Sequence, residues 1–364
     1  MVINHSKSIS IQMWRDLKYL LAYIIPAIVA HALYFKGFWS YNGITVAFII
    51  IPILESFLPG NTNNLTKNEE NDQLSKSIFN ILLYLNVPII LGLGYWYFHT
   101  ITYFPLETFE TIGLTLTVGI YFGGVGINVA HELGHRKEWF PQFLGKILLV
   151  PNLYMHFAIE HVHGHHVNIA TPKDPATSRF NENIYAFYVR SVVYSYISAW
   201  QLENKRLKNQ GSASFSIYNQ MIHFQLIQVA YLVSIVLFFG WAILPFAIIT
   251  AILGAMMLET VNYIEHYGLQ RRKLESGRYE TVQPWHSWNC NHDIGRILLY
   301  ELTRHSDHHY KASRQSQILR HFDKTPLLPW GYPTSMLIAL VPPLWFHLMN
   351  PKVEFYKEQI PELA

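Results

Sequence analysis

Residues 111–135 read TIGLTLTVGIYFGGVGINVAHELGH, and this stretch joins the two features that decide the fold. Its first part, 111–130, has no charged residue. It is long enough to cross the hydrocarbon core of a bilayer as a helix, which takes about 20 mostly apolar residues. The run ends at Ala130 and is followed at once by His131 and, four residues later, by His135. A membrane helix would therefore deliver two histidines to its end.

The composition of the whole chain agrees with a protein that is partly in lipid. Hydrophobic residues make up 51% of the 364 residues and charged residues 14%, well below the roughly 25% that is usual in soluble domains. The mean hydropathy of +0.14 is too low for a chain that lies wholly in lipid. The net charge of +3, without a dense basic run, gives no reason to expect a nucleic acid as a partner.

Six apolar runs are long enough to be membrane helices. The run at 224–258 is too long for one crossing, and Pro245 within it marks a turn, so it is interpreted as a hairpin of two spans. Soluble helices seldom run so far without a charge. We therefore predict an all-α integral membrane protein, with 1–364 as a single membrane-embedded domain. The predicted spans are 19–35, 37–54, 77–98, 111–130, 224–241 and 244–262.

Lysine and arginine predict the orientation of these spans. With six crossings, both chain ends, the 59–76 loop and the segments 131–223 and 263–364 lie on one side of the membrane. That side holds 26 of the 27 Lys and Arg residues, all except Lys36. Because these residues favour the cytoplasmic side, we predict a multi-pass protein of the inner (cytoplasmic) membrane with both termini in the cytoplasm.

Histidines gather on that same side. They form three clusters, HELGH at 131–135, EHVHGHH at 160–166 and RHSDHH at 304–309, and His266 stands alone after the sixth span. Each cluster lies at or beyond the cytoplasmic end of a predicted span. The cytoplasmic segments are therefore expected to form a helical cap that carries a histidine-rich metal site.

The spacing within the clusters suggests more than one metal ion. Residues four apart share one face of a helix, so His131 and His135 can point at one metal, and His161 and His165 repeat that spacing. Neighbouring residues point about 100° apart. The doublets 165–166 and 308–309 therefore suit two metals better than one.

Nine histidines form the predicted ligand set, together with carboxylates beside them. His163 is left out, because it lies two positions from both His161 and His165 and so on the opposite face. Metal-bound histidines usually donate their second N–H to a carboxylate, which predicts a supporting role for four acidic residues next to the clusters. The predicted ligands are His131, His135, His161, His165, His166, His266, His305, His308 and His309, and the supporting carboxylates are Glu132, Glu160, Glu265 and Asp307.

These residues leave the metal and the reaction open. Imidazole binds iron, copper, nickel and zinc, whereas a structural zinc site would close with four ligands. Cys290 is the single cysteine, which excludes a cysteine-built site within the chain. An open metal site beside lipid points to oxygen chemistry on a lipid-soluble molecule. A membrane zinc protease built on HELGH, with Glu132 as its base, and a metal transporter are competing interpretations.

The histidine motifs resemble those of the integral-membrane alkane 1-monooxygenase family, within the wider histidine-rich desaturase and hydroxylase superfamily. NYIEHYG is the most specific motif, because it separates this family from the ordinary desaturases. Thr303, Tyr310 and Trp285 depart from the residues that are usual beside the boxes, so the reaction type is better supported than the substrate. The resemblance runs through HELGHR at 131–136, EHVHGHHVNIATPKDPATSR at 160–179, NYIEHYGLQR at 262–271, HSWNCNH at 286–292 and RHSDHH at 304–309.

This resemblance implies a non-heme di-iron centre, with two Fe ions held by the nine histidines. It implies a monooxygenase that uses O₂ to hydroxylate a terminal or methyl C–H bond of a hydrophobic substrate, with a medium-chain alkane as the expected one. It also implies electrons from a separate rubredoxin-type donor and its reductase, since Cys290 alone cannot ligate the iron of a rubredoxin. A fatty-acyl desaturase or hydroxylase and an alkylbenzene methyl monooxygenase of the same superfamily remain alternatives.

Glycines of the fourth span suggest how such a substrate could reach the site. Gly123 and Gly126 lie one or two helical turns before His131. Small residues there would leave room for an alkyl chain or, equally, would let two helices pack closely. The first role predicts a slot between spans that opens to the lipid, in which the substrate dissolves.

Overall fold

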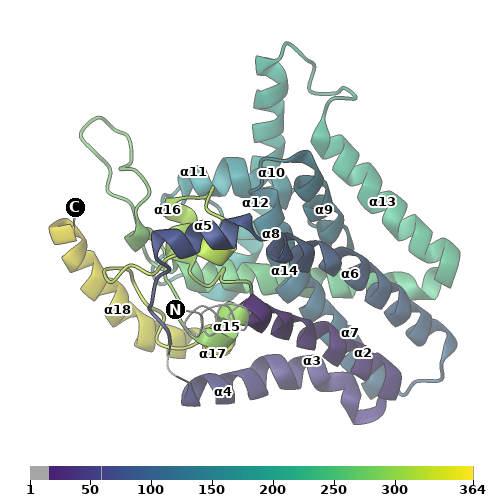
Figure 1. Cartoon of the computed structure of the whole chain (residues 1–364). Helices are drawn as coiled ribbons and strands as arrows, with labels where there is room; N and C mark the ends of the chain where they lie inside the picture. The colour runs from purple at the N-terminus through teal and green to yellow at the C-terminus, as the bar shows by residue number, and fades with distance from the viewer. Residues whose placement is uncertain (1–15, 59, 364) are drawn as a thin grey trace, which may run out of the picture.

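The computed structural model describes residues 16–58 and 60–363, and most of this part of the chain is helical (Figure 1). Outside the helices, the described residues form isolated β-bridges, such as that between Gly60 and His292. They form no β-strand. The prediction of an all-α fold is therefore confirmed.

Six helices in the described part of the chain are long and apolar enough to cross a membrane, as predicted. They run over Lys18–Phe35, Gly37–Phe57, Ile78–Tyr103, Thr108–Gly134, Gln220–Phe239 and Trp241–His266. Their elements are η1 (Lys18–Tyr23), α2 (Ile24–Phe35), η2 (Gly37–Tyr41), α3 (Asn42–Thr45), η3 (Val46–Ile50), α4 (Ile51–Phe57), α6 (Ile78–Tyr103), α7 (Thr108–Tyr121), η4 (Phe122–Ile127), α8 (Asn128–Gly134), α13 (Gln220–Phe239), η7 (Trp241–Ile243) and α14 (Leu244–His266).

Several span boundaries differ from the prediction by a few residues: the third span ends at Tyr103 rather than 98, the fourth covers Thr108–Gly134 rather than 111–130, and the last two are also shifted. The helix α13 begins at Gln220 rather than 224, because Asn219 caps it by accepting a hydrogen bond of 2.8 Å from the N–H of Met221. The turn lies at Gly240 and not at Pro245. Gly240 adopts a φ of 85°, which favours glycine, whereas Pro245 stands in the first turn of α14, where its missing N–H is not needed.

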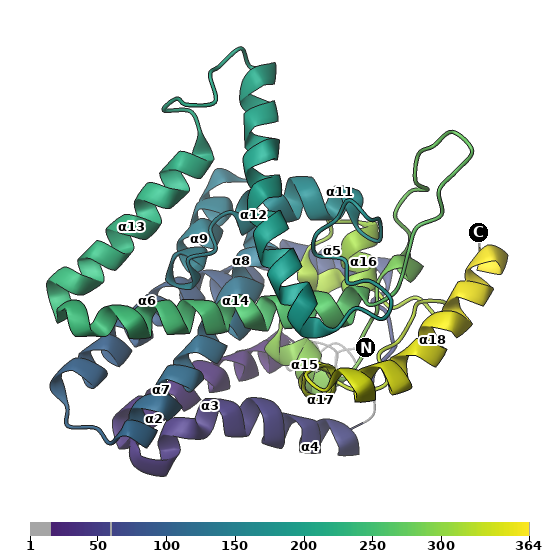
Figure 2. The same ribbon diagram turned by 180° about the vertical axis from the view of Figure 1, so that it is seen from behind.

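Shorter helices lie at the end of the bundle where the histidines are found. In Figures 1 and 2, α5, α11, α15 and α16 lie together near the same end of α2 and α6. The remaining elements are α5 (Lys67–Ser75), α9 (Trp139–Leu149), η5 (Val150–Asn152), α10 (Phe157–Glu160), η6 (His161–His165), α11 (His166–Asn168), α12 (Ile184–Asn209), η8 (Pro284–His286), α15 (Asp293–Leu298), α16 (His305–Tyr310), η9 (Ser316–Ile318), α17 (Tyr332–Ala339) and α18 (Pro342–Leu363).

Two buried hydrophobic clusters hold this arrangement together. The larger cluster lies between the spans and includes Leu82 of α6 and Val118 of α7. The second joins the end of α14 to α17 and α18 through Tyr263, Met336 and Trp345. The end of α14 carries His266, so this second cluster fixes the position of a predicted ligand.

Candidate metal centre

All nine predicted ligands come together in the structure, in two groups. Within each group the ring nitrogens that could bind a metal lie within 4.8 Å of one another. His163 is exposed and belongs to neither group. The first group is His131, His135, His161, His166 and His308, and the second is His165, His266, His305 and His309.

The distances within the groups fit ligands of a metal ion. In the first group, Nε2 of His161 lies 3.0 Å from Nε2 of His166. In the second, Nε2 of His309 lies 2.8 Å from that of His305 and 3.3 Å from that of His165. Two imidazole nitrogens bound about 2.1 Å from one metal, at a right angle, would lie about 3 Å apart. The donor set is therefore suited to one metal ion in each group.

Burial favours the neutral form of these imidazoles, which is the form that binds metals. It lowers the pKa of His135 to about 3 and, together with the neighbouring histidines, holds the pKa of His161 and His308 well below the ordinary value. His165 differs from them. Burial acts to lower its pKa, but the negative charge and the hydrogen bond of Asp174 raise it above the ordinary value.

The two doublets divide between the groups, but the prediction that His161 and His165 point at one metal is wrong. His161 shares its group with His166, and His165 lies in the other group. The reason is that η6 is a π-helical turn, in which the N–H of His166 donates to the carbonyl oxygen of His161. In a π-helix the hydrogen bonds join residues five apart, so positions i and i+5 replace i and i+4 on one face.

Glu265 contacts a histidine, although from an unexpected side. Its Oε2 lies 3.2 Å from Nε2 of His305, the same nitrogen that faces His266 and His309. Tyr332 donates a hydrogen bond to its other oxygen. The carboxylate therefore lies where a metal would be bound, and not behind the ring of the histidine.

The other three predicted carboxylates bind different partners in the described structure. Glu132 forms an ion pair of 2.6 Å with Arg136 and accepts a hydrogen bond from the N–H of Ser316. Asp307 is paired with Arg314 and accepts from the N–H of Arg320. The arginine beside Glu132 gives no support to a role as the base of a zinc protease.

Glu160 also binds a partner outside the two groups of histidines. Its Oε1 accepts a hydrogen bond of 3.3 Å from the hydroxyl of Ser198 in α12. The supporting roles of Glu132, Glu160 and Asp307 remain predictions, and they would act through these partners.

A carboxylate that does orient a histidine was not predicted. Oδ2 of the buried Asp174 lies 2.8 Å from Nδ1 of His165, so this ring is held with its Nε2 toward the second group. Asp174 stands outside the histidine clusters, in TPKDPATS. A usable signal was its turn chemistry, since its side chain accepts hydrogen bonds from the N–H of Ala176 and the hydroxyl of Thr177.

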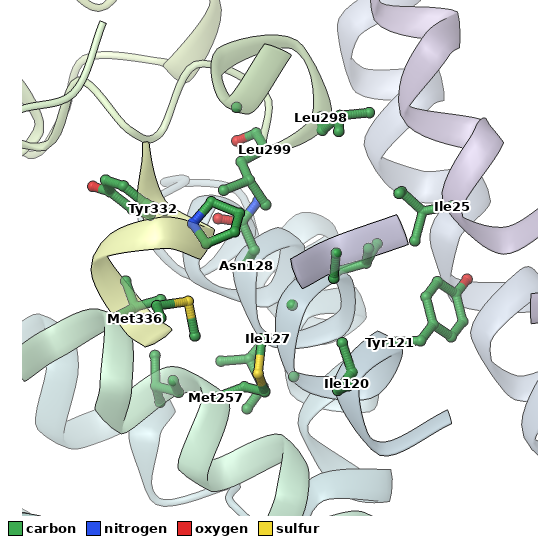
Figure 3. Close-up of a pocket in the computed structure, with 18 of the residues that line it drawn as sticks. Ile25, Ile120, Tyr121, Ile127, Asn128, Met257, Leu298, Leu299, Tyr332 and Met336 are labelled. Carbon is green, nitrogen blue, oxygen red and sulfur yellow. Dashed lines mark hydrogen bonds between the residues drawn. The ribbon is translucent and has the colours of Figure 1, made fainter. Parts of the chain in front are cut away.

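An apolar cavity of about 170 Å³ lies between the spans and reaches the histidines. Figure 3 shows residues that line it, among them Ile127, Leu299 and Tyr332. Its walls include Ile120 of α7, Met257 of α14 and Met336 of α17. His131 and His161 of the first group and His305 of the second also line it, as does Glu265. One apolar space therefore touches both groups of possible ligands.

The structure places Gly126 away from this cavity, so its predicted place in a substrate slot is not supported. A Cβ at this residue would meet Cδ1 of Ile90 at 3.3 Å and the carbonyl oxygen of Leu148 at 3.8 Å, in α6 and α9. Gly126 therefore serves the close packing of helices.

Gly123 and Gly124 both line the cavity, with different surroundings. A Cβ at Gly123 would meet the carbonyl oxygen of Gly254 at 2.5 Å, so this glycine lets η4 pack closely against α14. A Cβ at Gly124 would meet Cε of Met257 at 3.8 Å, an ordinary contact. Gly124 is therefore the glycine at which a larger side chain would enter the cavity.

Comparisons with known proteins match most of the chain. The fatty acid desaturase family model matches residues 107–333, which include all nine histidines. The chain is 37% identical to alkane 1-monooxygenase 2 of Pseudomonas aeruginosa, over 87% of this chain and 85% of that protein. It is 40% identical to the alkane 1-monooxygenase of Ectopseudomonas oleovorans, over 83% and 75%. It is 27% identical to the hydroxylase component of the xylene/toluene monooxygenase of Pseudomonas putida, over 93% and 89%.

The extent of these matches confirms the resemblance that the sequence motifs indicated. The similarity covers the spans as well as the histidine boxes, so it concerns the whole architecture and not the site alone. The protein is an oxidoreductase with a site suited to metal, and its chain belongs to the alkane 1-monooxygenase family of membrane monooxygenases.

Proposed function

We propose that this protein hydroxylates a terminal or methyl C–H bond of a hydrophobic substrate, with a medium-chain alkane as the preferred one. The observation that carries this proposal is the apolar cavity that touches histidines of both groups. An alkyl chain gains about 0.8 kcal/mol for each CH₂ that it buries in such a space. The relatives named alkane 1-monooxygenase support the choice of substrate.

The two groups of histidines would each hold one iron ion, with all nine as ligands. Iron is proposed from the family, because imidazole binds several other metals as well. Bound iron would supply the activation of O₂, with one oxygen atom entering the C–H bond and the other leaving as water, at the expense of two electrons and two protons. Glu265 would add a carboxylate oxygen beside His305.

The residues of the chain would orient the ligands and keep water from the reacting carbon. Asp174 fixes the ring of His165 through Nδ1 and leaves its Nε2 free for a metal. The cavity walls at Ile120, Met257 and Met336 would hold an alkyl chain by apolar contacts alone. The end of the chain would then lie against His131, His161 and His305.

The electrons would come from a separate protein. Cys290 is the single cysteine and is buried, so the chain cannot bind a rubredoxin-type iron of its own. We propose a rubredoxin-type donor with its reductase, as the family resemblance implies.

The metal centre and both chain ends would lie on the cytoplasmic side of the inner membrane. All Lys and Arg residues except Lys36 fall on that side of the six-span topology. A reporter fused after residue 364 and a tag in the 59–76 loop should both register as cytoplasmic. An external signal from either would contradict this orientation.

Metal analysis followed by product identification tests the reaction. The purified protein should contain two iron ions per chain. With O₂, rubredoxin, its reductase and NADH, it should convert an alkane to the 1-alcohol. Formation of an alkene from an acyl chain would instead identify a desaturase. Preference for an alkylbenzene methyl group would favour the second candidate, which the match to the xylene/toluene monooxygenase component supports.

The cavity can be tested as the substrate site by matched glycine substitutions. Gly124→Leu should shorten the preferred alkane while both metals stay bound, because the new side chain enters the cavity. Gly126→Leu is the control, since its side chain would press on α6 and α9 and not on the cavity. An unchanged chain-length preference in folded, metal-loaded Gly124→Leu protein would exclude this cavity as the substrate site.

A further inference from the structure

The helix α12 exposes an apolar face although it is not one of the six spans. Tyr185, Val189, Val193 and Ile197 follow one another at intervals of four, and between 41% and 69% of each side chain is exposed. Residues with this spacing lie on one face of a helix. Buried residues on the opposite face pack α12 against α10 and α14. The exposed face is therefore a stripe of apolar side chains that the described part of the chain leaves uncovered.

The charges of α12 divide along its length. In the first half, Arg190 turns away from the apolar stripe and forms an ion pair of 2.6 Å with Glu182. After Ile197, the exposed residues are polar or basic and include Gln201, Lys205 and Lys208. The helix therefore changes from an apolar to a basic surface along its own axis.

A second apolar surface lies at the turn between α17 and α18. Between Lys324 and Lys352 the sequence has no charged residue, which is the length of a membrane span. The structure breaks this run at Pro342, where α17 has ended and α18 begins, so it forms two helices joined by a short turn and not one helix that could cross. Leu340, Val341 and Leu344 are exposed at the turn.

The two surfaces adjoin each other and the membrane bundle. The hydroxyl of Tyr185 donates a hydrogen bond of 2.7 Å to the carbonyl oxygen of Leu340, which joins α12 to the turn. Both α12 and α17 pack against α14, the sixth span. In Figure 2, α12 runs across the direction of α14 rather than along it. A helix placed in this way at the end of a span would lie along the membrane surface.

We propose that these residues form an interfacial surface that is embedded in the lipid leaflet on the histidine side of the membrane. The interfacial surface consists of Tyr185, Val189, Val193, Leu340, Val341 and Leu344. Its lack of charge, its tyrosine and its continuity with a span fit the boundary between acyl chains and headgroups. Lys205 and Lys208 follow where α12 would reach anionic headgroups. This inference rests on the spans and the exposed residues, and it holds whatever substrate the enzyme oxidises.

The interfacial surface would also fix how deep in the membrane the cavity lies. One side of α17 carries Tyr332 and Met336, which line the cavity, and its other side carries the exposed Leu337. The helix α17 is therefore a wall with the cavity on one face and lipid on the other. An alkane dissolved in the leaflet would lie at the same depth as the cavity.

Spin labels at single cysteines test this surface in the full-length, metal-loaded protein. Val341→Cys and Val189→Cys are the test positions. Leu237→Cys, at a residue 79% exposed in the span α13, is the lipid reference, and Leu274→Cys, 46% exposed in the loop after α14, is the water reference. The parent protein, whose Cys290 is buried, gives the labelling blank. Liposomes of phosphatidylcholine and phosphatidylglycerol at a ratio of 3:1 serve as the membrane.

The measured quantity is the collision rate of each label with O₂, which concentrates in lipid, relative to that with a water-soluble nickel chelate. At the two test positions, this ratio should match that at Leu237 and exceed that at Leu274 several-fold. A ratio like that of Leu274 at either test position would overturn the proposal. That result is expected if a protein partner covers the surface instead, because the liposomes contain the enzyme alone. The measurement needs no turnover, so it can fail while the proposed function stands.

Discussion

Two histidine boxes, RHSDHH at 304–309 and EHVHGHH at 160–166, each have one ligand histidine followed by a doublet, but they differ in helical geometry. In α16, a regular α-helix, His305 and His309 are four residues apart and lie in the same group. His308, the first member of the doublet, lies in the other group. The α-helical repeat explains this division, because i and i+4 share a face and i+3 is turned away from it enough to reach the other group.

The earlier box has one more residue between its first histidine and its doublet. His161 and His166 are five residues apart and still lie in the same group, while His165 belongs to the other. The π-helical turn η6 takes up the additional residue. Each box therefore gives two ligands to one group and one to the other. The comparison shows that the type of helical turn, and not the spacing alone, decides which histidines lie in the same group.

The crossing histidines, His165 and His308, should give the largest effect when they are removed. Each of these two crosses between the groups: it belongs to one group, while the other two ligands of its box belong to the other group. Replacing either with Ala should lower turnover by at least ~100-fold, beyond the 10–100-fold typical of residues that only support a ligand, and should reduce bound iron. Turnover and iron content of the purified variants measure this, with membrane insertion checked separately.

His163→Ala is the matched control, because this exposed residue lies in the same box but outside both groups. Its activity should stay within about twofold of the parent, as for most surface substitutions. A loss at position 163 as large as that at 165 would contradict the ligand division within the box.

The fold could be predicted from the sequence because lipid imposes a simple rule on it. A charge-free run of about 20 residues has few alternatives to a membrane span, so the number of spans and the position of His131 at a span's end were accessible. The residues at which the helices end were harder to predict from the sequence. Hydrogen bonds from single residues, such as the cap at Asn219 and the turn at Gly240, set them within otherwise uniform apolar runs.

The sequence predicted which histidines come together in the structure, but not how they divide between the two groups. Histidine spacing selected eight of the nine that converge and excluded His163, because helical faces follow from sequence position, and the end of the sixth span selected His266. The π-turn did not follow from spacing, because spacing does not show how the turn packs: in the structure Gly164 lies so close to Glu160 that a Cβ would come within 2.4 Å of Oε1. Asp174 reaches His165 through a turn of its own, nine residues further along the chain, so a search among the residues next to the histidines could not find it.

Asp174 also distinguishes the two crossing histidines, and its removal should give an intermediate effect. Nδ1 of His165 is bound by Asp174, whereas Nδ1 of His308 has no hydrogen-bond partner in the described structure. Asp174→Asn keeps the shape and removes the charge. It should weaken metal binding about 10–100-fold, as is typical when a carboxylate behind a histidine ligand is lost. Titration of the apoprotein with Fe²⁺ under argon measures this.

Asp323→Asn is the control for Asp174→Asn, because Asp323 is a fully exposed carboxylate that is 3.4 Å from a histidine outside the two groups, His321. Its metal affinity should equal that of the parent. Equal affinities for the two variants would show that Asp174 does not support His165, and that the two crossing histidines are held in the same way.

The smallest effect is expected from Gly164→Ala, which tests how the π-turn of the earlier box is held. A Cβ at this position would lie 2.4 Å from Oε1 of Glu160 and 3.2 Å from Cδ1 of Leu202, so the buried Glu160 must shift. Overpacking of this kind costs about 1–3 kcal/mol, of which alanine's better helix propensity returns up to ~1 kcal/mol. We expect the free energy of unfolding to fall by about 1–2 kcal/mol and both metals to stay bound, since no ligand is removed.

Gly134→Ala is the control in the HELGH box, where a Cβ would meet nothing within 4 Å, and it should leave stability unchanged or slightly higher. Thermal unfolding measures the stability of both variants, and iron content shows whether both metals stay bound. If the two glycine variants are equally stable, the packing of Gly164 against Glu160 does not hold the π-turn, and the extra residue alone would account for the difference between the two boxes.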